Sequence, residues 1–182
     1  MLKVTKLAIE DVIILEYEVL EDNRGTKQAS YSKRELEKVG IHTEFVEEIV
    51  YFSKKKGTLY GIHFQNHPKA QTKLLYCTKG RGLDFAVDLR KSSKTYKQWV
   101  NIELSAENRK QIVIPVGFGH AFLSLEDDTH VVFRTDRYFD PKLQRAISYA
   151  DEEININFKV TDPILSKQDQ RAPLLRDSDC NL

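Results

Sequence analysis

The chain has 182 residues, of which 41% are hydrophobic and 30% are charged, and this composition predicts one globular domain with a substantial core. With 28 basic and 27 acidic side chains the net charge is +1, so there is no electrostatic case for nucleic acid or an anionic membrane as the main partner, although local basic pockets can still bind phosphate. Two cysteines without metal-site spacing indicate a reducing, cytoplasmic setting.

The N-terminal residues 1–19 form an apolar stretch that is interrupted by acidic side chains. Because the stretch also lacks a small-residue cleavage site, we expect neither a secretion signal nor a membrane span, but strands. Residues 11–19 are especially rich in β-branched and aromatic side chains, and the polar residues 21–25 that follow predict a turn.

A short helix is predicted over residues 33–39. Ser32 stands where an N-cap residue is favoured, Glu35 follows three residues later as in a capping box, and Gly40 marks the end of the helix. Residues 45–52 then predict another strand, and an exposed loop joins it to the next one.

Residues 59–65, with the sequence LYGIHFQ, predict a strand in which side chains point alternately to the two faces. A regular strand places His63 and Gln65 on one face and Tyr60 on the other, so we expect the face with His63 to line a polar cavity. Lys73 opens the next apolar run, close enough in sequence to return across the same sheet.

Beyond this point, strand-like runs alternate with turns at intervals of roughly eight to twelve residues, a spacing typical of an antiparallel sandwich or barrel. No alternating helical pattern comes between them. After residue 140 the chain is rich in loops, and a turn that begins with a proline carries Asp169. The runs expected to form strands are 73–77, 83–89, 99–104, 111–115, 120–125 and 129–139.

The chain contains, in this order, the blocks GIHFQ, KAQTKLLYC, FAVDLRKSSKTY, QWVNIELSAENRKQ, IPVGFGHAFLSL and PILSKQD. Their order and spacing resemble the deoxythymidine-diphosphate-4-dehydrorhamnose 3,5-epimerase family over nearly the whole chain. The resemblance implies a single all-β domain over residues 1–182, a cupin-type jelly roll (double-stranded β-helix) with a few short helices. It also implies a homodimer in which the N-terminal strands are exchanged.

The resemblance further implies an isomerase that works without a metal or another cofactor. Its substrate is a nucleotide-linked 4-keto-6-deoxysugar of rhamnose-type biosynthesis, and it inverts C3, C5 or both by removing a proton next to the ketone. By resemblance His63 is the base, Asp169 orients it and raises its basicity, and Lys73 stabilises the enolate oxygen.

Other residues are expected to bind the substrate. Arg24 matches a family arginine near the nucleotide diphosphate, and His120 lies in a matching block and is expected to contact the phosphates or the sugar. Gln65 shares the strand face that is expected to line the cavity. Tyr138 or Phe139 is expected to stack on the nucleotide base.

Several positions depart from the family pattern. Where the family places a tyrosine as the general acid, this chain has Phe133, which has no proton to give. Tyr60 stands in place of a family arginine, and a hydroxyl from Tyr60 or Tyr138 is our hypothesis for the missing proton donor. The remaining departures are Ala29, Glu48, Ile49 and Gln168.

Three functions fit these residues: an epimerase for a related nucleotide sugar, a nucleotide-sugar ketoisomerase of the same cupin group, and a nucleotide-sugar-binding protein without turnover. Exchange of substrate hydrogens with solvent separates the two enzymes from the binding protein, because exchange requires a working base. A metal-dependent cupin would need His63, His67 and His120 to converge, and Gln65 stands where such sites carry a second histidine. We therefore predict an epimerase with no bound metal.

Overall fold

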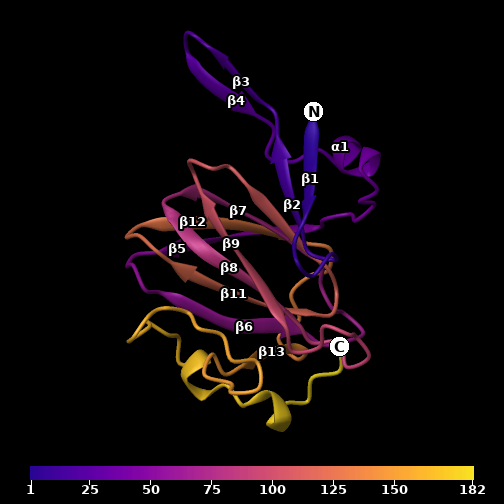
Figure 1. Cartoon of the computed structure of the whole chain (residues 1–182), viewed down its shortest axis with the longest axis vertical. Helices are drawn as coiled ribbons and strands as arrows, with labels where there is room; N and C mark the ends of the chain where they lie inside the picture. Colours follow the sequence, from indigo (N-terminus) through magenta and orange to yellow (C-terminus); the bar gives the residue numbers. More distant parts are fainter.

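Two antiparallel sheets form the body of the molecule in the computed structural model, which describes all residues from Met1 to Leu182 (Figure 1). The larger sheet has the order β1 (Leu2–Lys6), β2 (Ile13–Tyr17), β10 (Gln111–Ile114), β7 (Lys73–Lys79), β12 (Thr129–Thr135) and β5 (Glu47–Ser53). The smaller sheet has the order β13 (Gln144–Ile147), β6 (Leu59–Gln65), β11 (Phe118–Ser124), β8 (Arg81–Asp88) and β9 (Trp99–Ser105). The all-β prediction is confirmed.

The main core lies between the inner faces of the two sheets. Leu75 and Val131 of the larger sheet are in one buried cluster with Ala86 and Phe122 of the smaller sheet. Burial of these apolar side chains is the main force that holds the sheets together. The predicted alternation of residues 83–89 is found in β8, because Ala86 faces this core while its neighbours face the other way.

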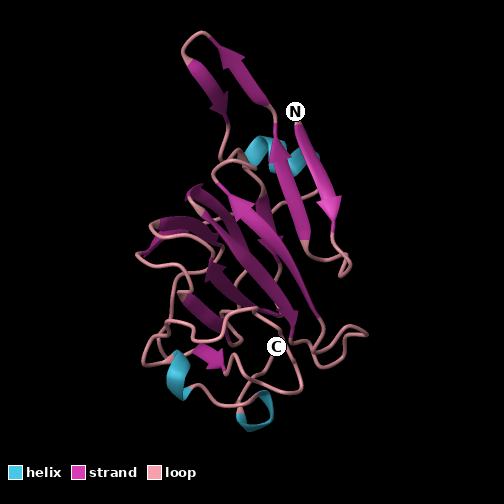
Figure 2. Ribbon diagram, turned by 60° about the vertical axis from the view of Figure 1, so that its left-hand side comes forward, coloured by secondary structure: helices cyan, strands magenta, loops and turns pink.

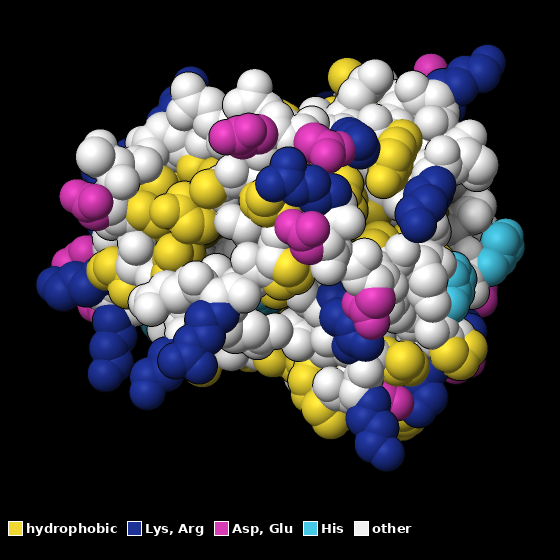
Figure 3. Space-filling view, turned by 90° about the horizontal axis from the view of Figure 1, so that it is seen from below, with side chains coloured by type: hydrophobic (Ala, Val, Ile, Leu, Met, Phe, Trp, Pro, Cys, Tyr) yellow, Lys and Arg dark blue, Asp and Glu magenta, His cyan; other side chains and the backbone are white.

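The C-terminal segment covers the outer face of the smaller sheet, below β6 and β13 in Figure 1. Ile154, Phe158 and Leu175 of this segment pack against Ile62 and Phe85 of the sheet in a second buried cluster. The segment has no strand after β13 and contains two 3₁₀ turns, η1 (Asp169–Arg171) and η2 (Leu175–Asp177). Its outer surface mixes charged groups of both signs with apolar side chains (Figure 3).

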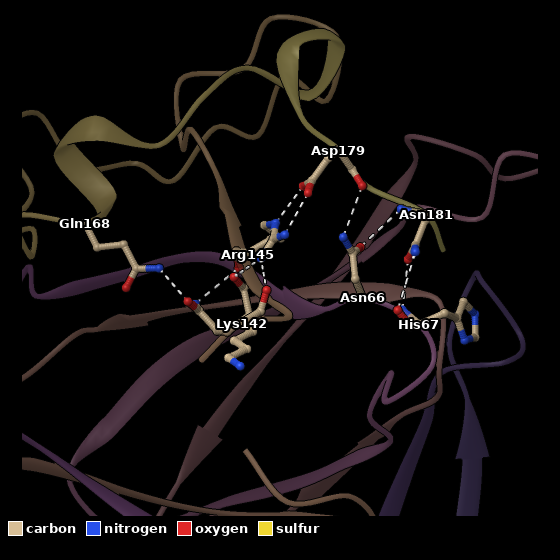
Figure 4. A network of polar contacts seen from close by, with 8 residues as sticks. Asn66, His67, Lys142, Arg145, Gln168, Asp179 and Asn181 are labelled. Carbon is tan, nitrogen blue, oxygen red and sulfur yellow. Dashed lines mark hydrogen bonds and ion pairs between the residues drawn. The ribbon is translucent and has the colours of Figure 1, made fainter. Parts of the chain in front are cut away.

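A polar network ties this segment to the edge of the smaller sheet (Figure 4). Arg145 on β13 donates two hydrogen bonds to the Asp179 carboxylate, at 2.6 and 2.7 Å. The Asn66 amide donates to the Asp179 backbone oxygen at 3.0 Å, and Gln168 donates to Gln144 at 2.7 Å. Since Gln168 directly precedes Asp169, the network helps to fix the part of the segment that carries the predicted catalytic carboxylate.

The N-terminal region contributes β1 and β2 to one edge of the larger sheet, and the chain then leaves the body of the molecule. The predicted helix is present as α1 (Lys33–Lys38), and the Ser32 hydroxyl accepts a bond from the Glu35 amide at 3.4 Å. The strand expected over 11–19 is divided between β2 and β3 (Val19–Asp22), and β3 pairs with β4 (Gly25–Gln28) in a hairpin that projects from the sheets (Figure 2). None of the helices has the length and apolar character needed to cross a membrane.

Candidate active site

His63 and Asp169 meet at the junction of β6 and the C-terminal segment. Nε2 of His63 lies 2.5 Å from Oδ1 of Asp169. Ser166 holds the same carboxylate, since its hydroxyl donates to Oδ2 at 2.7 Å and accepts from the Asp169 amide at 3.1 Å. The His63 side chain is 19% exposed and that of Asp169 is 3% exposed, so the carboxylate is shielded while the imidazole keeps some access to solvent.

The electrostatics of this pair leave one imidazole nitrogen free. Burial raises the pKa of Asp169, but hydrogen bonds from His63, Ser166 and the Gly61 amide outweigh this effect and hold the pKa below its usual value. The ionised carboxylate accepts the proton on Nε2, which leaves the lone pair on Nδ1. His63 can therefore take a proton at Nδ1.

A β-bulge in β6 changes which side chains face the cavity. The register between β6 and β11 shifts between the pairs Tyr60↔Phe122 and His63↔His120. As a result Tyr60 packs against the inner core, whereas Ile62 belongs to the outer cluster. The predicted regular alternation, which put Tyr60 on the face opposite His63, is therefore wrong. Bulges of this kind often redirect side chains beside active sites.

Lys73, the first residue of β7, is buried close to His63. Its Nζ donates to the backbone oxygen of His63 at 3.3 Å, and the residue is 8% exposed. Burial lowers its pKa to about 8, although the carboxylate of Asp84 opposes the shift. Lys73 therefore remains mostly a cation at neutral pH, in surroundings of low polarity where a positive charge acts strongly on a nearby oxyanion.

His120 is bound by a buried carboxylate beside this lysine. Nε2 of His120 lies 2.9 Å from Oδ2 of Asp84, and both side chains are at most 7% exposed. Burial lowers the pKa of His120 and raises that of Asp84, while the attraction between the two groups opposes both shifts. The ring of His120 does not belong to the cavity wall described next.

A cavity of about 90 Å³ opens between the sheets beside His63. Its wall includes Tyr51, Lys73, Phe133 and Phe139, so it combines a base, a buried cation and aromatic faces. Several hollows are larger: two of about 400 and 410 Å³ lie beside the N-terminal hairpin and under the C-terminal segment, and two others have about 220 Å³ each. We place the site at the smaller cavity because none of these larger hollows is lined by His63 or Lys73.

Tyr51 on β5 is one of the cavity residues that the sequence analysis missed, together with Phe64, Gln71 and Gln144. Its ring stacks on Tyr60 with centroids 4.3 Å apart and planes at 4°, and it also contacts Phe133 at 4.9 Å. In the structure β5 alternates, with Ile49 and Tyr51 half-buried and Val50 exposed, but residues 49–52 are all apolar, so the sequence has no alternation that reveals Tyr51. The sequence predicts the strand but not which of its faces meets the cavity.

The predicted Gln65 and Tyr138 lie outside the cavity wall, while Phe139 is part of it. Gln65 is buried and holds the backbone of the following loop. It donates to the Lys69 oxygen at 2.5 Å and to the Tyr138 oxygen at 3.2 Å, and it accepts from the Asp140 amide at 2.8 Å. It therefore positions the loop that presents Phe139. The Tyr138 side chain is 67% exposed.

Neither tyrosine of our hypothesis provides a hydroxyl at the cavity wall. The Tyr60 hydroxyl is engaged by the Ser53 hydroxyl at 3.3 Å, and Tyr138 points into solvent. This part of the prediction is therefore wrong. Arg24 also lies away from the cavity of its own chain, in the turn of the β3–β4 hairpin, where it forms an exposed ion pair with Asp22.

The three histidines considered for a metal site do not converge. His63 is bound to Asp169 and His120 to Asp84, whereas the backbone of His67 contacts Asn181 of the C-terminal segment. No group of three or more His, Cys, Asp or Glu side chains is arranged to hold a metal ion.

Comparison with known proteins places these features in a family. The family model described as dTDP-4-dehydrorhamnose 3,5-epimerase matches residues 6–177. A dTDP-4-dehydrorhamnose 3,5-epimerase of Shigella flexneri is 40% identical over 98% of both chains. The crystal structure of a Bacillus anthracis dTDP-4-dehydrorhamnose 3,5-epimerase with TDP and PPi bound is 40% identical, covers 96% of this chain and 100% of its own, and superposes with a TM-score of 0.93. A Legionella pneumophila dTDP-6-deoxy-D-glucose-3,5-epimerase in complex with dTDP-4-keto-L-rhamnose gives 33% identity, coverage of 98% and 95%, and a TM-score of 0.92. The shared fold confirms the expected cupin-type jelly roll.

Proposed function

The chain belongs to the dTDP-4-dehydrorhamnose 3,5-epimerase family, and on that premise we propose that it is an isomerase that inverts C3, C5 or both of a nucleotide-linked 4-keto-6-deoxysugar. The observation that carries the proposal is the His63–Asp169 pair beside a buried lysine at one cavity. In these residues His63 provides the base, and the lysine provides a positive charge that stabilises the oxyanion formed when the base removes a proton.

In the proposed reaction His63 removes a hydrogen next to the C4 ketone. The C–H bond breaks, its proton moves to Nδ1, its electron pair forms the new carbon–carbon double bond, and the π electron pair of the carbonyl moves to the C4 oxygen. Asp169 keeps the proton of Nε2 in place and stabilises the imidazolium that forms. The ammonium group of Lys73 stabilises the enolate oxygen. Reprotonation from the opposite face then inverts the carbon.

The substrate class is supported by the relatives. The two solved relatives described above carry TDP and dTDP-4-keto-L-rhamnose, which favours a thymidine nucleotide for this chain as well. Phe139, on the cavity wall and 55% exposed, is placed to stack on a sugar or base face.

A homodimer completes the proposal. The β3–β4 hairpin leaves its own chain's body and exposes Val19 and Leu20, as a segment that packs on a second copy would. In such a dimer Arg24 would contact the substrate diphosphate in the partner's cavity, a role that suits its planar set of donors. We expect a solution mass of about twice the 21.1 kDa of one chain, and an Arg24→Ala variant with a raised KM.

We further propose that residues 1–182 act as one domain in the cytoplasm. The two cysteines, Cys77 and Cys180, are buried and unpaired, and a reducing compartment favours free thiols.

The test is to identify the sugar that the protein makes. The purified protein is incubated with dTDP-4-keto-6-deoxyglucose, the keto group is reduced with borohydride, and the released 6-deoxysugars are separated. L-Rhamnose would report inversion at both C3 and C5, and a sugar with one altered centre would report a single inversion. Recovery of only the reduced starting sugar, while calorimetry shows that the substrate binds, would contradict the proposal and favour a binding protein. A His63→Asn variant is the matched negative control.

A further inference from the structure

Inversion needs a second proton-carrying group, and His63 cannot fill both roles. A base that returns the proton to the face from which it came restores the original centre. The proton that inverts the carbon must reach it from the opposite face of the sugar ring. This inference rests on the proposed function and concerns which side chain supplies that proton.

Tyr51 lies on the wall that faces the base. His63 belongs to β6 in the smaller sheet, and Tyr51 belongs to β5 in the larger sheet. Both side chains line the same cavity between the sheets. The imidazole and the phenol therefore reach the cavity from different sheets.

The ring of Tyr51 is held firmly while its hydroxyl is left free. Tyr60 stacks on it at 4.3 Å with nearly parallel planes, and Phe133 packs on it at 4.9 Å. No group of the chain hydrogen-bonds to the Tyr51 hydroxyl, whereas the hydroxyl of Tyr60 is engaged by Ser53. A fixed ring with a free hydroxyl is the arrangement expected of a group that donates to a ligand.

The protonation state of Tyr51 suits a donor. Burial raises its pKa to about 12, and the neighbouring Tyr60 and Asp169 add to this effect. The phenol is therefore protonated over the whole neutral range. The enolate carbon, which forms a C–H bond, is basic enough to take that proton.

We infer that Tyr51 is the proton donor that completes the inversion in this chain. The Tyr51 O–H bond breaks, its proton forms the new C–H bond on the face opposite His63, and the C4 ketone is restored as the enolate electrons return. The tyrosinate then takes a proton from water, and Nδ1 of His63 releases its proton to water. Each inversion thus replaces one carbon-bound hydrogen by one from the solvent.

Other side chains of the site fit this role less well. Phe133 has no acidic proton, and Tyr60 and Tyr138 do not line the cavity. Lys73 is on the wall, but its ammonium group is needed at the enolate oxygen, and its contact with the His63 backbone keeps it near the base. Tyr51 is the one wall residue that carries a hydroxyl.

The experiment separates proton removal from inversion. Wild type, Tyr51→Phe and His63→Asn are incubated with dTDP-4-keto-6-deoxyglucose in heavy water. Deuterium gain is measured by mass spectrometry of the sugar, and inversion by separation of the borohydride-reduced products. Because the Tyr51 hydroxyl has no partner within the chain, the phenylalanine should fold normally, which a melting curve checks. The control Tyr149→Phe removes a hydroxyl from a ring in the outer cluster, away from the cavity.

We expect Tyr51→Phe to keep exchange within a few-fold of wild type while inversion falls roughly 10²–10⁴-fold, the usual contribution of one acid or base. The deuterium should then appear in sugar of unchanged configuration, because His63 returns it to the original face. His63→Asn should lose both signals, and Tyr149→Phe should lose neither.

Two outcomes overturn the inference while the proposed function stands: inversion by Tyr51→Phe at nearly the wild-type rate, and parallel loss of exchange and inversion in a variant that melts normally. A wild type that exchanges without inverting would also overturn it. A wild type with neither exchange nor inversion would instead contradict the proposed function itself.

Discussion

Gly61 and Asp169 lie so close together that a Cβ atom on Gly61 would be 2.6 Å from Oδ1 of the carboxylate. Real Cβ atoms essentially never approach another atom to this distance, so the carboxylate needs a glycine at this point of the bulge. The contact links the local distortion of β6 to the chemistry of His63, since the same oxygen accepts its Nε2 proton.

Gly61→Ala is therefore predicted to displace Asp169 and to weaken its bond to His63. We expect solvent exchange of the substrate hydrogens to fall at least tenfold, with a small loss of thermal stability, because the methyl group can be relieved by moving one side chain. Exchange kinetics and a melting curve measure the two effects. An alanine variant with wild-type exchange would show that the carboxylate position is not needed.

Asp169→Asn tests the carboxylate with little change in shape. An amide cannot stabilise the imidazolium and can favour the wrong tautomer, so kcat should fall roughly 10²–10⁴-fold with a smaller change in KM. Ser166→Ala is the milder companion, because it removes one of the bonds to Asp169 and leaves the charge. Equal activity of Asp169→Asn and wild type would remove Asp169 from the mechanism.

Lys73 is predicted to set the alkaline limit of activity. Because burial lowers its pKa to about 8, the fraction of enzyme with an ammonium group at the enolate falls as pH rises through that value. The rate should decline above about pH 8. A decline caused by Tyr51 would come only near its pKa of about 12. Lys73→Met should lower kcat roughly 10²–10³-fold, as removal of an oxyanion-stabilising group does. The variant should also lack the decline of the rate with rising pH. A wild-type rate that stays constant to pH 10 would contradict the role.

The same lysine should reduce the stability of the fold. Its folded pKa lies below the unfolded value of 10.5, so its charge is disfavoured in the folded state below about pH 8, and the penalty disappears as pH rises toward 10.5. The free energy of unfolding of Lys73→Met is expected to exceed that of wild type by on the order of 1 kcal/mol at neutral pH. This gain in stability is limited because the buried Asp84 carboxylate loses the nearby ammonium group that stabilises its charge. Chemical denaturation at pH 7 and pH 10 measures the difference, which should shrink at the higher pH.

A hydroxyl moved to the neighbouring ring should partly replace that of Tyr51. The two rings are 4.9 Å apart and both line the cavity, so the double variant Tyr51→Phe/Phe133→Tyr is predicted to invert the sugar at least tenfold faster than Tyr51→Phe alone. The product assay used for the single variant measures it. A double variant as slow as the single one would mean that position 51 offers a geometry that position 133 does not.

Much of the fold could be predicted because local patterns agree with it. The alternation of residues 83–89 matches the two faces of β8, and Ser32 caps α1 as expected. The bulge in β6 could not be predicted, because a shift of one residue depends on pairing with β11 and leaves little trace in the sequence. It is the reason why Tyr60 was placed on the wrong face.

The site could be predicted only in part, for a similar reason. The resemblance identifies His63, Lys73 and Asp169, and the structure brings Asp169 to His63 across 106 residues of sequence and Lys73 to His63 across 10. Tyr51 has no counterpart among the predicted roles, since its importance comes from a cavity that only the packing of two sheets creates. Gln65 was predicted to touch substrate, but a buried amide with three backbone partners acts as a support for the loop instead.

The most direct test of the account is the rate at which C3 and C5 hydrogens of dTDP-4-keto-6-deoxyglucose are lost in heavy water, followed by proton NMR with wild type and with His63→Asn. We predict loss of one or both signals with wild type and no loss above the uncatalysed rate with the variant. Equal loss with both proteins, or no loss with wild type despite measurable binding, would contradict the assignment of His63 as the base.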